Sequence, residues 1–185
     1  MTQTVNTAYD LFDAGRYDEA YASLSKLAEA GDGSANLHLG WINQKGLGRQ
    51  VDLTKAEQHY LSAYKHGVPE AQYYLGCLYR SMGRYQEALR HLEEAASQGH
   101  PSAAYWVHVI YNDGEGVTKD SGRAVQYLQK ASDLGHIFAK RDLAKRAIRG
   151  EFGLAKIPSG FCALISNAIN GASIASANPD DVRVR

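Results

Sequence analysis

The strongest constraint on the fold is an internal repeat marked by glycine. Four glycines recur at intervals of 36, 32 and 36 residues, and an alanine follows each of them four positions later: Gly31, Gly67, Gly99 and Gly135, then Ala35, Ala71, Ala103 and Ala139. A second set of alanines keeps the same register: Ala20, Ala56, Ala88 and Ala124. Agreement at several marks in one register indicates stacked copies of one structural unit.

Each unit has the pattern of two helices joined by a turn. In the third unit, apolar residues at helical spacing stand on both sides of a turn at residues 82–84: Leu75, Leu78 and Tyr79, then Ala88, Leu89, Leu92 and Ala95. Gly99 follows where a helix favours a left-handed residue at its C-terminal end. In units two and four the turn is four residues longer, and Asp52 and Asp120 are suited to cap the second helix.

These units predict an all-α solenoid of stacked antiparallel helix pairs. One pair cannot bury both of its faces, and ordering each residue's backbone costs about 1–2 kcal/mol, so neighbouring pairs must cover each other. Small residues such as Gly40 and Gly76 mark the places where two helices cross closely. We predict a repeat array in residues 1–150 with about four and a half units, divided as 3–34, 35–70, 71–102, 103–138 and 139–150.

Residues 151–185 are predicted to form a capping helix and a tail. Lys156 and Asp180 bracket a run of 23 residues without a charge, in which apolar residues share one helical face: Phe161, Leu164, Ile165, Ala168, Ile169 and Ala172. Such a helix would close the end of the solenoid. The alternative is that residues 159–174 dock on a second copy or on a membrane surface, and the absence of Lys and Arg from their polar face disfavours the membrane.

The charge balance and the cysteines narrow the classes of partner. With 20 Lys+Arg and 20 Asp+Glu the chain is formally neutral, and we expect no nucleic acid partner because phosphates need a surplus of cations. The charge is uneven: residues 1–33 hold six acidic and two basic side chains, whereas residues 139–156 hold six basic and two acidic ones. Two cysteines make no disulfide framework, and no secretory signal is visible, so we expect a cytoplasmic protein.

No group of residues has the pattern of a catalytic or metal site. The seven histidines lack the spacing of metal ligands, and we predict no metal, no cofactor and no enzymatic activity. The glycine pairs at 46–48 and 114–116 follow helices and lack the P-loop lysine, which indicates turns. His100 and His136 directly follow repeat glycines, and we expect both to cap the C-terminal end of the preceding helix.

Units two and four resemble Sel-one-like repeats, and units one and three resemble the related tetratricopeptide repeats with their shorter turn. The long turn follows the pattern Gly-x-Gly-Val-x-x-Asp-x-x-x-Ala, which unit four matches at Gly114, Gly116, Val117, Asp120 and Ala124. Unit two departs from this pattern only in Val51, which is displaced. The resemblance covers residues 3–150 and identifies the sequence as similar to Sel-one-like proteins of the tetratricopeptide-like superfamily.

The resemblance implies a right-handed superhelix in which the first helix of each pair lines a concave groove. Carried over unit by unit, the groove residues would be Tyr9, Leu37, Trp41, Tyr73, Arg80, Tyr105, Arg141 and Lys145. Tyrosine and tryptophan are enriched at protein interfaces, and Arg and Lys can pair with acidic groups of a partner. Two alternatives stay open: the aromatic rings could pack between helices, and the basic residues of the last helix could form a solvated face.

Both families are mostly adaptor modules, so the resemblance implies a protein–protein interaction scaffold that presents its groove to a partner protein or peptide. The alternative is a self-assembling structural protein, a homo-oligomer that associates through its end units or through the C-terminal amphipathic helix.

Overall fold

The computed structural model describes residues 2–149 and 151, and this part of the chain contains helices and no strand. The helices are α1 (Thr2–Asp13), α2 (Tyr17–Glu29), α3 (Gly33–Lys45), α4 (Leu53–Lys65), α5 (Glu70–Ser81), α6 (Tyr85–Ser97), α7 (Pro101–Asp113), α8 (Ser121–Asp133) and α9 (Ile137–Ile148). Within this described part, every helix is too short or too polar to span a membrane. The predicted C-terminal helix lies outside the described residues.

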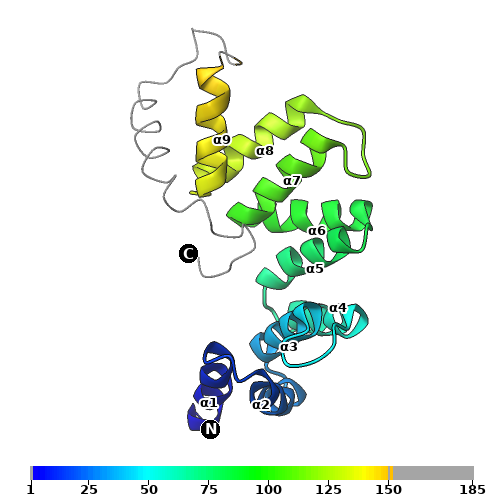
Figure 1. The fold of residues 1–185 in the computed structure, drawn as a ribbon, viewed down its shortest axis with the longest axis vertical. Helices are drawn as coiled ribbons and strands as arrows, with labels where there is room; N and C mark the ends of the chain where they lie inside the picture. Colours follow the sequence, from blue (N-terminus) through cyan, green and yellow to red (C-terminus); the bar gives the residue numbers. More distant parts are fainter. Residues whose placement is uncertain (1, 150, 152–185) are drawn as a thin grey trace.

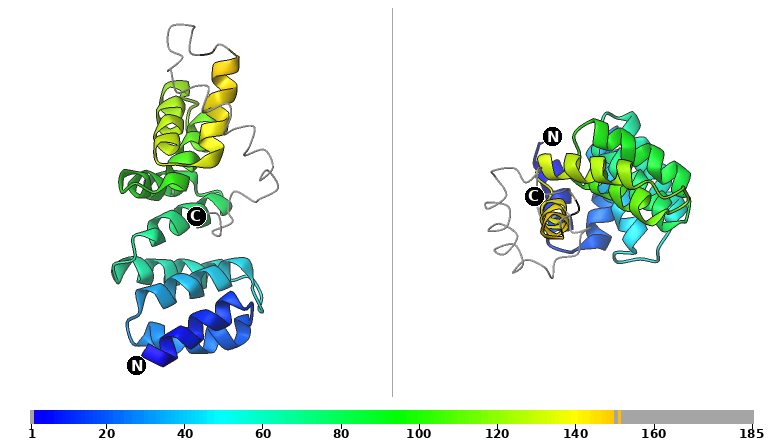
Figure 2. Two further views of the ribbon diagram at one scale, coloured as in Figure 1. Left: turned by 90° about the vertical axis from the view of Figure 1, so that its left-hand side faces the viewer. Right: turned by 90° about the horizontal axis from the view of Figure 1, so that it is seen from above.

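The helices stack in chain order along one axis. Figure 1 shows α1 and α2 at one end of the molecule and α9 at the other, and the side view in Figure 2 shows the same succession. Each helix packs mainly on the helices before and after it, most extensively within the pairs α3–α4, α5–α6 and α7–α8. A smaller contact joins α5 to α7, the first helices of two successive pairs. The prediction of an all-α repeat solenoid is confirmed.

The core is a row of clusters with no common centre. One cluster joins α1, α2 and α3, the next joins α4, α5 and α6, and a third extends from α5 to α9. The alanines that mark the middle of each unit are fully buried in these clusters: Ala20, Ala56, Ala88 and Ala124. Burial is therefore shared between neighbouring pairs, as the stacking of incomplete units requires.

Two glycines allow the helices of a pair to cross at close range. A Cβ atom on Gly76 of α5 would lie 2.5 Å from Cγ of Leu92 on α6, and a Cβ on Gly40 of α3 would collide with the ring of Tyr60 on α4. Tyr60 and Leu92 are both fully buried. Bare backbone at Gly40 and Gly76 therefore makes room for the large side chain of the partner helix, which confirms their predicted role as crossing points.

Aspartates begin the second helices of the long-turn units. Oδ1 of Asp52 accepts a hydrogen bond from the backbone N–H of Lys55 at 2.9 Å, and Oδ1 of Asp120 accepts one from Arg123 at 2.9 Å. Each bond satisfies a backbone donor that has no partner within the helix. Both predicted caps are confirmed.

His100 and His136 have a side-chain role that differs from the prediction. Their backbone N–H groups close the preceding helices, as expected, by donating to carbonyls in the last turn. Their imidazole rings, however, cap the following helices, because Nδ1 of His100 accepts from Ala103 N at 3.2 Å and Nδ1 of His136 accepts from Ala139 N at 3.3 Å. The predicted capping of the preceding helix is confirmed for the backbone, and the side-chain caps of the following helices were not predicted from the sequence.

Tyrosines of the first helices cover these histidine caps. The ring of Tyr73 stacks on His100 with centroids 4.3 Å apart, and the ring of Tyr105 stacks on His136 at 4.5 Å. Burial lowers the pKa of His136 from 6.5 to about 4. The neutral ring that results is the form that can accept a hydrogen bond from a backbone N–H.

We expect Gly76→Ala to destabilise the protein by about 1–3 kcal/mol, because the added methyl group overpacks the crossing against Leu92. Urea denaturation followed by circular dichroism measures this change. Since Leu92 is the obstacle, the penalty should shrink when Gly76→Ala is made in a Leu92→Ala background. Equal penalties in both backgrounds would show that the crossing is not the cause.

We expect His136→Asn to flatten the loss of stability in acid. The unfolded chain binds a proton at the ordinary histidine pKa of 6.5 but the folded chain only near 4, so stability is unaffected by the titration of His136 above 6.5 and is lost progressively as the pH falls from 6.5 to 4. Asparagine caps helices well and does not titrate. Between pH 7 and pH 5 the free energy of unfolding should therefore fall less in the variant, by about 2 kcal/mol, in urea titrations at each pH.

Burial also lowers the pKa values of His59, His91 and His108. These three histidines are present in the wild type and in His136→Asn, so they contribute the same acid-dependent loss of stability to both. An identical acid loss in the wild type and in His136→Asn would contradict the neutral cap.

Candidate functional site

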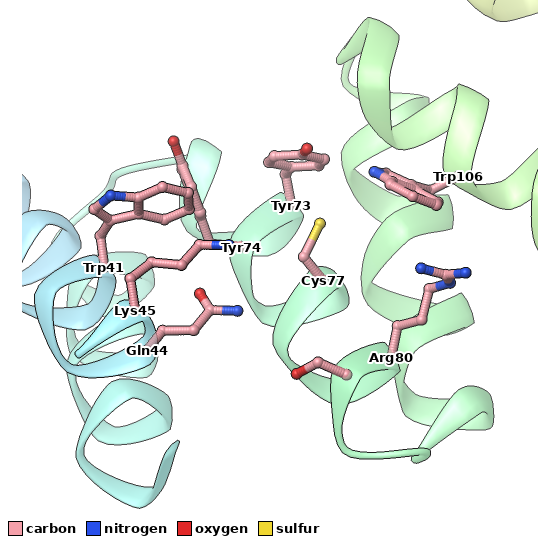
Figure 3. A pocket seen from close by; sticks show the side chains of 9 residues that line it. Trp41, Gln44, Lys45, Tyr73, Tyr74, Cys77, Arg80 and Trp106 are labelled. Atoms are coloured by element: carbon pink, nitrogen blue, oxygen red, sulfur yellow. The ribbon is translucent and has the colours of Figure 1, made fainter. Parts of the chain in front are cut away.

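A hollow lies between the first helices of three successive pairs, α3, α5 and α7. It is lined by Trp41, Gln44, Lys45, Tyr73, Tyr74, Cys77, Arg80, Ser81 and Trp106, and we call it the tryptophan pocket (Figure 3). Its volume of about 120 Å³ is well below the roughly 300–1,000 Å³ of small-molecule sites. The pocket is therefore of a size for one inserted side chain.

Helix α5 provides the floor of the pocket. Tyr73 is only 8% exposed and meets the ring of Tyr74 edge-on at 5.3 Å. The ring of Tyr74 in turn meets Trp41 edge-on at 5.7 Å and stacks on Tyr60 of α4 at 5.4 Å. These contacts hold the aromatic floor in place, so a ligand side chain would meet rings that are already ordered.

The two walls of the pocket are tryptophans, each covered by a cation. On one side the ammonium of Lys45 lies 4.6 Å from the ring centroid of Trp41, and on the other the guanidinium of Arg80 lies 4.3 Å from that of Trp106. Figure 3 shows the two tryptophans on opposite sides of the α5 floor. A cation over a ring face is attracted by the ring's negative charge density, which favours these positions of the cations.

Arg80 is also held by a carboxylate from the turn between α7 and α8. Nε and Nη2 of Arg80 each lie 2.7 Å from an oxygen of Glu115, which makes a bidentate pair. The two side chains are 29% and 22% exposed. Paired hydrogen bonds of this geometry fix the plane of the guanidinium, and here they hold it over Trp106.

The long turns bind back onto the preceding unit. In the turn at residues 46–51, the guanidinium of Arg49 lies 3.3 Å from the ring centroid of Tyr21 and 3.9 Å from Asp18. In the turn at residues 114–119, the carbonyl of Gly116 accepts a hydrogen bond from Gln86 Nε2 at 2.7 Å. These contacts join units one to two and three to four beyond the packing of the helices.

Three of the eight predicted groove residues meet in the tryptophan pocket: Trp41, Tyr73 and Arg80. Tyr73 both lines the pocket and packs on His100, so the two alternatives that the sequence left open for this ring apply together. Leu37 lies elsewhere, packed against the cluster of α4, α5 and α6. Tyr9 also lies outside the pocket, and its hydroxyl donates to Asp32 at 3.2 Å.

The remaining three predicted residues gather around one carboxylate of α9. The hydroxyl of Tyr105 donates to Oδ2 of Asp142 at 2.9 Å, while Arg141 and Lys145 lie 3.2 and 3.8 Å from Oδ1. Burial raises the pKa of Tyr105 to about 12, so its hydroxyl keeps the proton that it donates. Both predicted cations of α9 thus already face an acidic group of their own helix.

Sequence reasoning missed Tyr74 and Trp106, which line the pocket beside the predicted residues. Both occupy the same repeat position, one residue after Tyr73 and Tyr105, and His38 has this position in unit two. A ring at one position in three successive units was the signal that could have identified them. The Arg80–Glu115 pair had no such signal, because the turn that carries Glu115 is absent from units one and three.

The repeats match known families in register with the observed helix pairs. Residues 33–68 and 101–136 match the Sel1 repeat, and residues 69–98 match the tetratricopeptide repeat. The chain is a Sel1-like repeat protein. In the part that the structure describes, this Sel1-like repeat protein has no group of three or more His, Cys, Asp or Glu residues that could hold a metal ion. Repeats of both families generally serve as scaffolds for protein interactions.

Solved structures share the fold of this Sel1-like repeat protein. A Sel1 repeat protein from Oxalobacter formigenes is 24% identical with a TM-score of 0.68, and the match covers 81% of this chain and 61% of that one. A protective antigen of uropathogenic Escherichia coli that displays an SLR fold is 28% identical with a TM-score of 0.63, over 70% of this chain and 29% of that one.

Among curated proteins, the rat DAP3-binding cell death enhancer 1 is 23% identical over 204 aligned positions, which cover 89% of this chain and 39% of the relative. The chain spans well under half the length of the curated relatives that it matches.

Proposed function

We propose that this Sel1-like repeat protein is an adaptor that binds a partner protein or peptide in the tryptophan pocket, where one apolar side chain of the partner enters between Trp41 and Trp106. One observation carries this proposal. The chain has two tryptophans in all, and they form opposite walls of one hollow. Tryptophan dominates binding energy at protein interfaces when it lies in a well-packed pocket.

The geometry of the pocket supports a side chain as the ligand. Its volume of about 120 Å³ is too small for a typical cofactor or metabolite. Its floor and walls come from three different helix pairs, so a bound segment would contact α3, α5 and α7 together. Since the rings of Tyr73 and Tyr74 are already fixed by packing, binding orders few further side chains, which favours affinity.

The name of one relative supports the same class of function. The rat protein aligned over most of this chain is described by its name as binding DAP3, a protein partner. For this chain the partner is defined by the chemistry of the pocket, an exposed apolar side chain on an accessible segment.

The test is to pan a displayed library of random peptides against the full chain and to titrate synthetic copies of the enriched peptides. Trp41→Ala should weaken binding by about 30-fold, the effect of losing a contact of roughly 2 kcal/mol at the centre of an interface. The matched control is Leu61→Ala, which removes an exposed apolar side chain of α4 outside the pocket and should leave affinity unchanged. Because both tryptophans line the site, bound peptide should also change the intrinsic tryptophan fluorescence.

Circular dichroism of the Trp41→Ala variant should show unchanged helix content. Peptides that bind the variant and the wild type equally, or that leave the tryptophan fluorescence unaltered, would overturn the proposed site.

A further inference from the structure

The charged side chains that line the tryptophan pocket are all basic. Lys45 and Arg80 are its charged residues, and no acidic side chain is among the lining residues. Lys45 lies beside the wall formed by Trp41, and its side chain is exposed to solvent. Within the described part of the chain, Lys45 has no carboxylate at ion-pair distance. The pocket therefore combines an apolar floor with a cation that has no ionic partner in these residues.

The second cation, Arg80, is engaged by a carboxylate that does not belong to the pocket. Glu115 lies in the long turn after α7 and reaches Arg80 with both of its oxygens, at 2.7 Å each. It takes Nε and Nη2, the edge of the guanidinium that binds a carboxylate through two bonds. A carboxylate arriving from a partner would compete with Glu115 for this edge.

We propose that the partner segment of this adaptor is acidic, with a carboxylate next to the apolar side chain that enters the pocket, and that Glu115 occupies the place of that carboxylate at Arg80 in the free protein. This inference rests on the proposed function and names the chemistry of its partner. The apolar side chain lies between the tryptophans, one carboxylate pairs with Lys45, and a carboxylate on the other side displaces Glu115 from Arg80.

Glu115 acts in this arrangement as an internal competitor. Because Glu115 belongs to the same chain, its effective concentration at Arg80 is high. A carboxylate of the partner must therefore bind Arg80 more favourably than Glu115 does at that effective concentration. The competition selects against weakly acidic or neutral segments and also keeps Arg80 neutralised when the pocket is empty. Removing the charge of Glu115 should therefore strengthen, and not weaken, the binding of an acidic ligand.

Three short synthetic peptides test the proposal. Each has a central phenylalanine, flanked on both sides by glutamate in the first, glutamine in the second and lysine in the third. Titrations of the full chain followed by tryptophan fluorescence should rank them in that order. The glutamate peptide should bind about tenfold more tightly than the glutamine peptide, as expected for one charge-assisted hydrogen bond, and this advantage should shrink as salt is added.

Two variants separate the roles of the pocket charges. Lys45→Gln should remove most of the advantage of the glutamate peptide over the glutamine peptide, and the side chain of Lys45 is exposed to solvent. Glu115→Gln should raise affinity for the glutamate peptide by about threefold to tenfold relative to the glutamine peptide. The matched control is Glu29→Gln, which makes the same change of net charge at an exposed site of α2.

The outcomes distinguish this inference from the proposed function. Equal binding of the glutamate and glutamine peptides, each still weakened by Trp41→Ala, would leave the pocket as the binding site and overturn its acidic preference. Weaker binding of the glutamate peptide by Glu115→Gln would show that Glu115 positions Arg80 for the partner and does not compete with it. Loss of fluorescence response to every peptide would overturn both proposals.

Discussion

The stack depends on two places where a helix presents bare backbone to its partner. At Gly40 and Gly76 the absence of a Cβ atom admits the side chains of Tyr60 and Leu92 into the crossing. The two helices of α3–α4 and of α5–α6 can then approach closely, and the outer faces of each pair must be covered by the next pair. The row of core clusters and the order of the helices along the molecule both follow from this requirement.

The same stacking produces the tryptophan pocket. Helices α3, α5 and α7 lie on successive levels, and α5 contributes aromatic residues and Arg80 between Trp41 of α3 and Trp106 of α7. The long turn after α7 then adds Glu115, which holds Arg80 against the wall formed by Trp106. The turn at residues 114–119, whose sequence indicates only a connection between two helices, thereby fixes the guanidinium of Arg80 in the candidate site.

The repeat marks predicted the helices, the crossings and the aspartate caps, because these features depend on spacing alone. The caps at His100 and His136 could not be predicted in the same way, since histidine is not a common helix cap and its ring accepts a backbone hydrogen bond only in the neutral form, which burial favours at His136. The pocket was predicted in part: Trp41, Tyr73 and Arg80 occupy groove positions inherited from the family, whereas Trp106 stands one residue outside them. The pairing of Arg80 with Glu115 depends on the path of a turn, which no periodicity specifies.

A row of clusters without a common centre means that stability is carried by nearest neighbours. A terminal pair can open without disrupting the pairs beyond it, and opening becomes rarer toward the middle of the array. Backbone amides should therefore exchange with solvent fastest in α1 and slowest in α5, the helix covered on both sides by complete pairs. The candidate site is built around α5, so fraying at either end leaves this site assembled.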